Sequence, residues 1–232
     1  VQRESSLTIE MSPPLHNKQY GITDYTMRIK EAGGIGYVPQ SGILKALQDT
    51  IVQDKGHIDQ LADISATLLT TFNDVHKLGV GIDKAETSWL NFFGNNKYTA
   101  PTGTTYNQMQ YTWHVDPTTG DRWMEAVGAT VTRTKTAGPP PQTSVTTSAT
   151  AATPEDRLRS MQIINALKIA DELTAPGGQN LVAARQIIDP GTGKKLVPTL
   201  SGAGSTYTYQ DAWVNGTADG TMAVEVSKLF NI

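Results

Sequence analysis

The chain has 232 residues, a formal net charge of −3 at pH 7 and no cysteine. This length suffices for one large domain or two small ones, and the lack of cysteine excludes thiol catalysis, thiolate metal sites and disulfides. A pI of about 5.8 gives no general attraction to nucleic acid or anionic lipid, and no apolar run approaches the ~20 residues that cross a bilayer. We therefore expect neither nucleic-acid binding nor membrane insertion.

The first part of the chain, residues 1–40, is expected to be β-rich. The stretch LTIEM (7–11) alternates weakly between apolar and polar residues, and ITDYTMRIK (22–30) places Tyr25, Met27 and Ile29 on one face of a strand. A cluster of glycines then interrupts the pattern. We expect short strands joined by turns.

A long helix is predicted from Gly42 to Leu78, a stretch without proline in which apolar residues recur at intervals of three and four. Ser41 is a plausible N-cap and Gly79 a plausible end, and Gly56 is a weak point at which the helix could bend. The spacing is close to a heptad seam, which is typical of helices that pack along other helices. The seam residues are Leu44, Leu47, Ile51, Ile58, Leu61, Leu68 and Val75.

Such a helix would be about 55 Å long, at 1.5 Å per residue. A compact globule of this chain length has a radius of gyration of only about 17 Å. We therefore predict an α+β protein in which an elongated helical rod carries a β-rich, Thr-rich hairpin domain.

The Thr-rich segment 101–152 is predicted to form that hairpin. MQYTWHV and WMEAVGATV both alternate with period two, and DPTTGD (116–121) lies between them as a turn. With a simple register Trp113 and Trp123 face one another, either as a small core or as an exposed aromatic platform. The following tract, TAGPPPQTSVTTSATAATP, is expected to be a flexible or extended connector.

The last part of the chain, residues 153–232, is predicted to begin with a second amphipathic helix. Thr153 is a good N-cap, followed by proline and two acidic residues, and the apolar pattern continues to Leu173. RQIIDPGTGKKLVP is expected to be a small hairpin, and GTMAVEVSKLF (220–230) a short third helix. We therefore expect four segments: residues 1–40, residues 41–100 with the long helix and its loop, residues 101–152, and residues 153–232.

The polar residues at the end of the long helix suggest two alternatives. Asn73 and His76 have the spacing of two metal ligands on a helix, but Asn binds transition metals poorly and no second His lies within a turn. The other interpretation is that these side chains hydrogen-bond the helix end and the loop that follows. We favour the second and expect no catalytic, cofactor or metal site, although an enzyme site assembled from distant residues such as His114 and Asp116 is a further alternative.

The same region carries a resemblance to a known family. SGILKALQDT, then a long helix ending FNDVHKLGVGID, then NFFG, resembles the central part of the flagellar hook-associated protein 1 family, and ADGTMAVEVSKLFN (218–231) is similar to the start of that family's C-terminal rod helix. The residues that match are Phe72, Asn73, His76, Gly79, Gly81, Asp83, Phe92 and Phe93.

The resemblance implies a structural protein and not an enzyme. It implies an adaptor at the hook-filament junction of the bacterial flagellum, secreted by the flagellar export system and packed against copies of itself, hook protein and hook-associated protein 3. The terminal coiled-coil segments of that family are not in this sequence, so an export chaperone would bind only through an absent segment. The alternative is an extracellular binding module or adhesin that uses the aromatic face of the hairpin, through Tyr111, Trp113 and Trp123.

Overall fold

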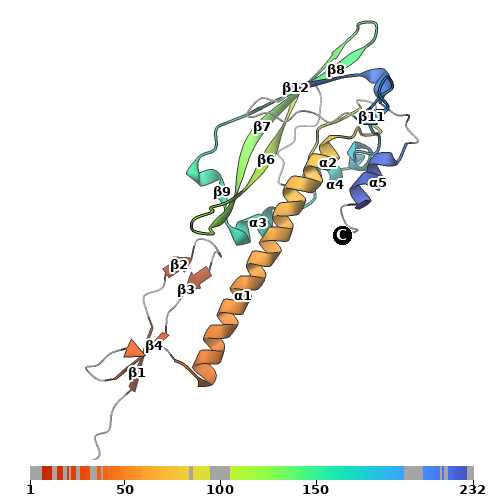
Figure 1. Ribbon diagram of the computed structural model, residues 1–232. Coiled ribbons are helices and arrows are strands. Elements are labelled where there is room, and N and C mark those ends of the chain that lie inside the picture. Colours follow the sequence, from red (N-terminus) through yellow and green to blue (C-terminus); the bar gives the residue numbers. More distant parts are fainter. Residues whose placement is uncertain are drawn as a thin grey trace, which may run out of the picture.

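The computed structural model has a mixed α+β architecture, as the sequence predicts. One long helix packs with its C-terminal part against an antiparallel sheet, and short helices surround their junction (Figure 1). The structure describes residues 7–11, 15–17, 20, 22–24, 27–31, 36–37, 39–83, 86–94, 105–195, 206–214, 216 and 219–228.

Short strands precede the long helix. β1 (Leu7–Met11) pairs antiparallel with β4 (Met27–Glu31), which also pairs with β5 (Gly36–Tyr37). β2 (Leu15–Asn17) pairs with β3 (Ile22–Asp24). The strand predicted at LTIEM is confirmed, whereas ITDYTMRIK is divided between β3 and β4, because its two halves pair with different strands.

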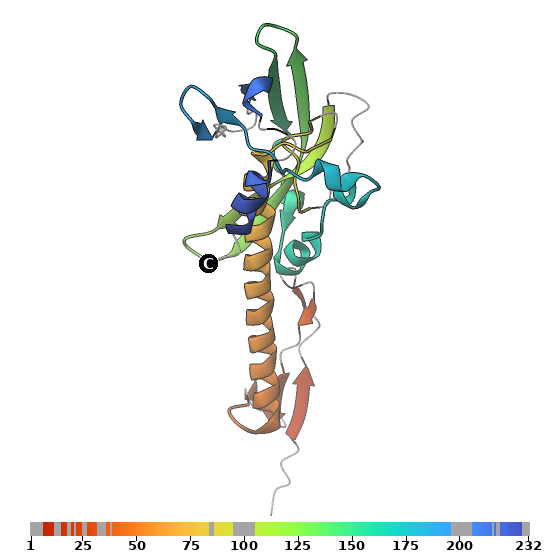
Figure 2. The same cartoon turned by 90° about the vertical axis from the view of Figure 1, so that its right-hand side faces the viewer.

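Asp59 joins parts of the chain that are far apart in sequence. Its carboxylate accepts hydrogen bonds from the Tyr20 hydroxyl at 2.9 Å and from the Ser160 hydroxyl at 2.7 Å. The Lys55 ammonium lies 5.5 Å from the centre of the Tyr20 ring, a distance at which a cation is attracted to an aromatic face. The N-terminal strands lie beside the lower part of the long helix (Figure 2).

The long helix is continuous over the predicted range. α1 (Gly42–Thr67) runs into a π-helical segment (Leu68–Phe72) and then α2 (Asn73–Lys77), a total length of about 54 Å at 1.5 Å per residue. Ser41 is extended at the N-cap position, but its side chain makes no capping hydrogen bond. α1 passes through Gly56 without interruption, so the departure from α-helical geometry lies at the π segment instead.

The face that the helix buries coincides with the predicted seam only in part, since Ser65 and Phe72, which continue the heptad spacing, are buried. Within the seam, Leu47, Ile51 and Leu61 are 50%, 43% and 53% exposed, and Leu44, Ile58, Leu68 and Val75 are only partly buried. The neighbouring face is buried instead, because its small residues let the sheet residue Met124 and helix α3 approach closely. This buried face consists of Ala62, Ser65, Ala66, Leu69, Phe72, Asn73 and His76.

The predicted hairpin is confirmed. β6 (Thr105–Val115) and β7 (Arg122–Thr136) pair antiparallel along the full length of β6. In the turn between them the Asp116 carboxylate accepts hydrogen bonds from the backbone N–H groups of Thr118 and Thr119, at 2.8 and 3.2 Å. These bonds satisfy the turn backbone locally, as Asp side chains commonly do.

The tract predicted as a connector contains a strand, so that prediction is wrong. β8 (Gln142–Ala149) pairs with β7, and its Thr143 and Val145 are each 1% exposed. β-Branched residues at alternate positions suit a half-buried strand, and the prolines at 139–141 lie in the turn before it. β12 (Thr206–Gln210) extends the sheet beyond β8, while β9 (Arg157–Leu158) pairs with another part of β7.

The two tryptophans of the hairpin lie on opposite faces of the sheet. Trp113 is opposite Met124, and Trp123 is opposite His114, whose ring stacks on it at 5.3 Å between centroids. The Arg157 guanidinium also lies 5.1 Å from the Trp123 ring centre. The predicted facing pair is therefore wrong, because a register shift of one residue moves a side chain to the other face.

The predicted second helix is split. Its N-terminal cap forms, since the Asp156 carboxylate accepts hydrogen bonds from the backbone N–H and the hydroxyl of Thr153, each at 2.8 Å. The helix that follows is only a 3₁₀ turn (Pro154–Asp156), because the next two residues join the sheet as β9. α3 (Ser160–Ala166) and α4 (Asp171–Thr174) come after it.

The remaining C-terminal elements are short. A 3₁₀ turn (Gly178–Leu181) precedes the predicted hairpin, which is present as β10 (Ile188–Asp189) and β11 (Lys194–Lys195). A further 3₁₀ turn (Asp211–Trp213) leads to α5 (Thr221–Lys228), the predicted third helix. None of the described helices is sufficiently long and apolar to span a bilayer.

Two hydrophobic cores hold these elements together. One lies between the loop after α2 and the part of the sheet that contains β8 and β12. The other lies between α1, α3 and the part of the β6–β7 hairpin near its turn. The first contains Val80, Trp89, Leu90, Tyr106, Val131, Val145, Ile187 and Tyr209. The second contains Ala62, Ala66, Leu69, Met124 and Ile163.

The hairpin register predicts which apolar side chains carry stability. Met124 is fully buried, so Met124→Ala should lower the free energy of unfolding by about 2–5 kcal/mol. Val115 lies on the same face but is 52% exposed, so Val115→Ala should change it by less than about 0.5 kcal/mol. Denaturant unfolding of the two variants measures the difference, and equal effects would contradict this register.

Candidate functional site

Asn73 fastens the end of the long helix to the loop that returns past it. Its Nδ2 atom donates hydrogen bonds to the carbonyl oxygens of Leu69 and Phe93, both at 2.8 Å. Its Oδ1 atom accepts hydrogen bonds from the backbone N–H groups of Phe92 and Phe93, at 2.9 and 2.8 Å. The side chain is fully buried, and this one amide satisfies four backbone groups.

His76 makes a second connection one helical turn later. Nδ1 lies 2.7 Å from the Leu90 carbonyl oxygen, and Nε2 accepts a hydrogen bond from the Ala183 N–H at 3.0 Å. A carbonyl only accepts and a backbone amide only donates, so these partners select the neutral tautomer with its proton on Nδ1. Burial lowers the pKa of His76 to about 4; the hydrogen bond to Leu90 opposes this shift, and the nearby Lys77 charge adds to it.

Aromatic rings close around these two polar side chains. Phe72 lies 5.0 Å from both Phe92 and Phe93, measured between ring centroids, and Phe92 lies 5.3 Å from the His76 ring. The rings are tilted or edge-on, the arrangements that aromatic pairs prefer. Phe72, Asn73, His76, Phe92 and Phe93 together are called the helix-end anchor below.

The two glycines after α2 are required by space. A Cβ atom at Gly79 would lie 2.7 Å from the Ala183 Cβ and 2.8 Å from the Met222 Cγ, and one at Gly81 would lie 2.6 Å from the Asn180 carbonyl oxygen. All three distances are shorter than van der Waals contact. Gly79 therefore allows the chain leaving the helix to pass close to the C-terminal segment.

Asp83 organises the loop between these glycines and the anchor. Its carboxylate accepts hydrogen bonds from the backbone N–H and the hydroxyl of Thr87, each at 2.8 Å. Its carbonyl accepts from the Glu86 N–H at 2.9 Å. The eight residues that carry the family resemblance thus lie in one continuous structural unit.

An ion cluster that sequence reasoning missed ties the same loop to distant strands. Arg185, only 4% exposed, donates from Nε to the Gly81 carbonyl at 3.1 Å, and its guanidinium lies 3.3 Å from the Glu86 carboxylate. Lys135 of β7 lies 2.7 Å from the other oxygen of that carboxylate. Partial burial disfavours ionised Glu86, but Lys135 and then Arg185 outweigh it and lower the pKa of Glu86. No local pattern indicates these pairs, because Glu86 and Arg185 are 99 residues apart.

The anchor has the chemistry of a structural site. Both ring nitrogens of His76 and both polar atoms of Asn73 are engaged by backbone groups, so neither side chain can serve as a metal ligand without breaking these bonds. Within the described part of the chain, no three His, Asp or Glu side chains gather in a way that could hold a metal ion. His114 lies in β6 of the hairpin, where its Nε2 is 3.1 Å from the Glu125 carboxylate.

Comparison with known proteins does not extend this description. No protein-family model, curated protein or solved structure matches the chain.

Removal of the Asn73 amide should be costly. Asn73→Ala leaves two N–H groups and two carbonyls of the helix and loop without their partner, and we expect the free energy of unfolding to fall by at least about 3 kcal/mol. Thr71→Ala, at an exposed position two residues earlier, serves as the control and should change it by less than about 0.5 kcal/mol. Thermal and denaturant unfolding measure both, and an Asn73→Ala protein as stable as the control would contradict the anchoring role.

Stability should depend on pH through His76. Because its pKa is lowered from 6.5 to about 4 in the folded chain, the unfolded chain binds the proton more readily between these values. Stability is therefore greatest above about pH 6.5, and about 3 kcal/mol is lost as the pH falls to about 4. Denaturant unfolding between pH 7.5 and 4 measures this slope.

His76→Ala should be less stable at pH 7 and should lose most of this slope. His57→Ala, a change at an exposed position of α1, should keep it. An unchanged slope in His76→Ala would show that other groups cause the dependence.

Proposed function

We propose that this chain is a structural component of the bacterial flagellum, an adaptor at the hook-filament junction that joins hook to filament through subunit packing. The observation that carries the proposal is the long helix, which is anchored rigidly at one end and presents uncovered apolar side chains along the rest. The resemblance to the flagellar hook-associated protein 1 family gives the proposal its biological setting.

The uncovered surface of α1 is extensive. Ile43, Val52 and Ile64 are 80%, 68% and 57% exposed, in addition to the exposed seam residues Leu47, Ile51 and Leu61. Soluble monomers rarely leave so many large apolar side chains on one element, and such patches commonly mark protein interfaces. The near-heptad spacing of the seam suits packing along other helices. This supports an elongated rod in which neighbouring copies, hook protein and hook-associated protein 3 supply the missing contacts.

The anchor explains how such a helix could bear load. Asn73 and His76 connect its last turns to the backbone of residues 90–93 and to Ala183, so the helix end cannot shift without breaking buried hydrogen bonds. Buried bonds of this kind are costly to leave unmade. A force on the rod would therefore pass directly to the β-rich body.

In this proposal the Thr-rich sheet faces outward and the chain is extracellular, secreted by the flagellar export system. It needs no cofactor, and it is not an enzyme. The alternative role, an adhesin acting through the aromatic face of the hairpin, requires Trp113 and Trp123 to share a face. Their opposite orientation removes the platform on which that alternative depends.

Substitutions on the uncovered seam can test the proposal in motile cells that carry a deletion of the gene. Leu47→Glu combined with Leu61→Glu should leave the monomer folded, because both residues are exposed, but charges at a helix interface should abolish filament attachment. Gln53→Glu combined with Gln60→Glu adds the same charge at exposed polar positions of α1, about 110° around the helix axis from Leu47 and Leu61 at 3.6 residues per turn, and should restore attachment. Electron microscopy of cell-attached filaments measures the outcome. Deleted cells that keep their filaments would refute the proposed role.

A further inference from the structure

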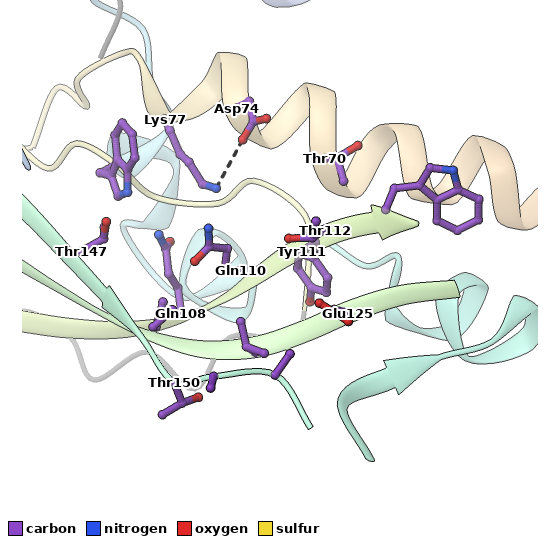
Figure 3. Close-up of a pocket in the computed structure, with 17 residues that line it drawn as sticks. Thr70, Asp74, Lys77, Gln108, Gln110, Tyr111, Thr112, Glu125, Thr147 and Thr150 are labelled. Carbon is purple, nitrogen blue, oxygen red and sulfur yellow. Dashed lines mark ion pairs between the residues drawn. The ribbon is translucent and has the colours of Figure 1, made fainter. Parts of the chain in front are cut away.

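A groove of about 600 Å³ lies between the end of the long helix and the sheet. Thr70, Asp74 and Lys77 form its helical side, and Gln108 and Gln110 of β6 lie across from them. Figure 3 shows Lys77 extending from α2 into this space, on the side of Gln108 and Gln110. The volume is within the range of about 300–1,000 Å³ that small-molecule sites occupy.

Lys77 has too few partners for its position. Its side chain is only 12% exposed, and its ammonium group has three N–H donors. Within the described chain its one ion-pair partner is Asp74, which is itself 54% exposed and lies 3.6 Å away. Burial lowers the pKa of Lys77, and the charge of Asp74 only partly opposes this. The ammonium thus makes one long ion pair within the described chain, and its remaining N–H groups are open to an acceptor that enters the groove.

Gln108 also offers an unused donor. It is 5% exposed, and its Oε1 accepts a hydrogen bond from the Asn91 N–H at 3.1 Å. This bond fixes the orientation of the amide, and among the described residues its Nε2 group has no acceptor. Lys77 and Gln108 therefore supply preorganised donors from opposite sides of the groove.

The charges of the lining do not select an anion. Two carboxylates, Asp74 and Glu125, accompany the one ammonium of Lys77, so the groove has a net negative charge. The Glu125 carboxylate lies 3.1 Å from the Nε2 atom of His114. The exposed Gln110 adds a neutral amide to the lining. A ligand suited to this lining is uncharged and has several groups that both donate and accept hydrogen bonds.

Aromatic side chains complete the lining. Tyr111 and Trp113 border the groove together with threonine hydroxyls, whereas Trp89, which also lines it, is 4% exposed and belongs to the first core. Aromatic surface packs well against the C–H faces of a sugar ring, and amides, carboxylates and an ammonium can pair with vicinal hydroxyls. We propose that this groove binds a neutral saccharide, with Lys77 and Gln108 as donors to its hydroxyl oxygens. This proposal does not depend on the assembly role, because that role uses the exposed apolar side chains of α1 and none of them lines the groove.

Titration calorimetry and saturation-transfer NMR with maltose, lactose and the β-1,4 disaccharide of N-acetylglucosamine would test this directly. We expect saturable binding of at least one of these sugars and weaker binding of glucuronate, whose carboxylate meets Asp74 and Glu125. Lys77→Met keeps the length and apolar stem of the side chain and should weaken the binding by at least about tenfold, the loss expected for a hydrogen bond to a charged donor. Gln110→Ala, at an exposed position of the groove, should weaken it less.

The melting temperature separates a binding role from a structural one. Removal of a poorly paired buried ammonium should leave the melting temperature of Lys77→Met unchanged or raise it. The matched control is Lys168→Met, since Lys168 makes an i,i+3 pair with Asp171 at 3.4 Å outside the groove, and it should keep wild-type binding.

Three results would overturn the proposal. These are no saturable binding of any of the three disaccharides at tens of millimolar, binding that is equal in Lys77→Met and wild type, or tighter binding of glucuronate than of the neutral sugars. A lower melting temperature in Lys77→Met together with no sugar binding would assign Lys77 to the fold alone.

Discussion

The side-chain amide of Asn73 holds the backbone of the returning loop against the end of the long helix, and much of the structure depends on this connection. Four backbone groups in a fully buried place are satisfied by one residue. Once residues 92 and 93 are held there, their rings pack on Phe72. His76 extends the same connection to Ala183, so the backbone at this residue is held to the same helix end.

This arrangement divides the long helix into two parts with different surroundings. The part near the anchor packs against the sheet through small residues such as Ala62 and Ala66, whereas much of the preceding part leaves large apolar residues in solvent. Burial of apolar area is the main source of folding free energy, so the preceding part gains little within this chain. A partner that covers it would recover that free energy, which is why the proposed assembly role uses mainly the preceding part of the helix and the internal packing uses the part near the anchor.

The groove at Lys77 arises from the same geometry. The π segment and α2 bring Lys77 over the edge of the sheet, where β6 supplies amides and aromatic rings. A close-packed core would have filled this space with apolar side chains. Its polar lining and its poorly paired ammonium lower the stability of the fold. Destabilising features of this kind are commonly retained at binding sites.

Elements with local signals could be read from the sequence, and contacts between distant segments could not. The long helix has a proline-free apolar period, and the hairpin has alternation around an Asp-Pro turn, so both were predicted with nearly correct limits. Asn73 and His76 could be recognised as residues that need partners because they are polar residues among apolar ones. Apart from the Leu69 carbonyl, however, these partners lie 14 to 107 residues away. The strand β8, the division of the second helix by β9, the face of α1 that is buried and the Glu86–Arg185 pair were missed. Each depends on which surface another segment presents, and this is decided only when the chain has folded. Local periodicity and turn chemistry in the sequence therefore determined where the elements form, while long-range pairing and close packing in the tertiary structure decided which faces they bury.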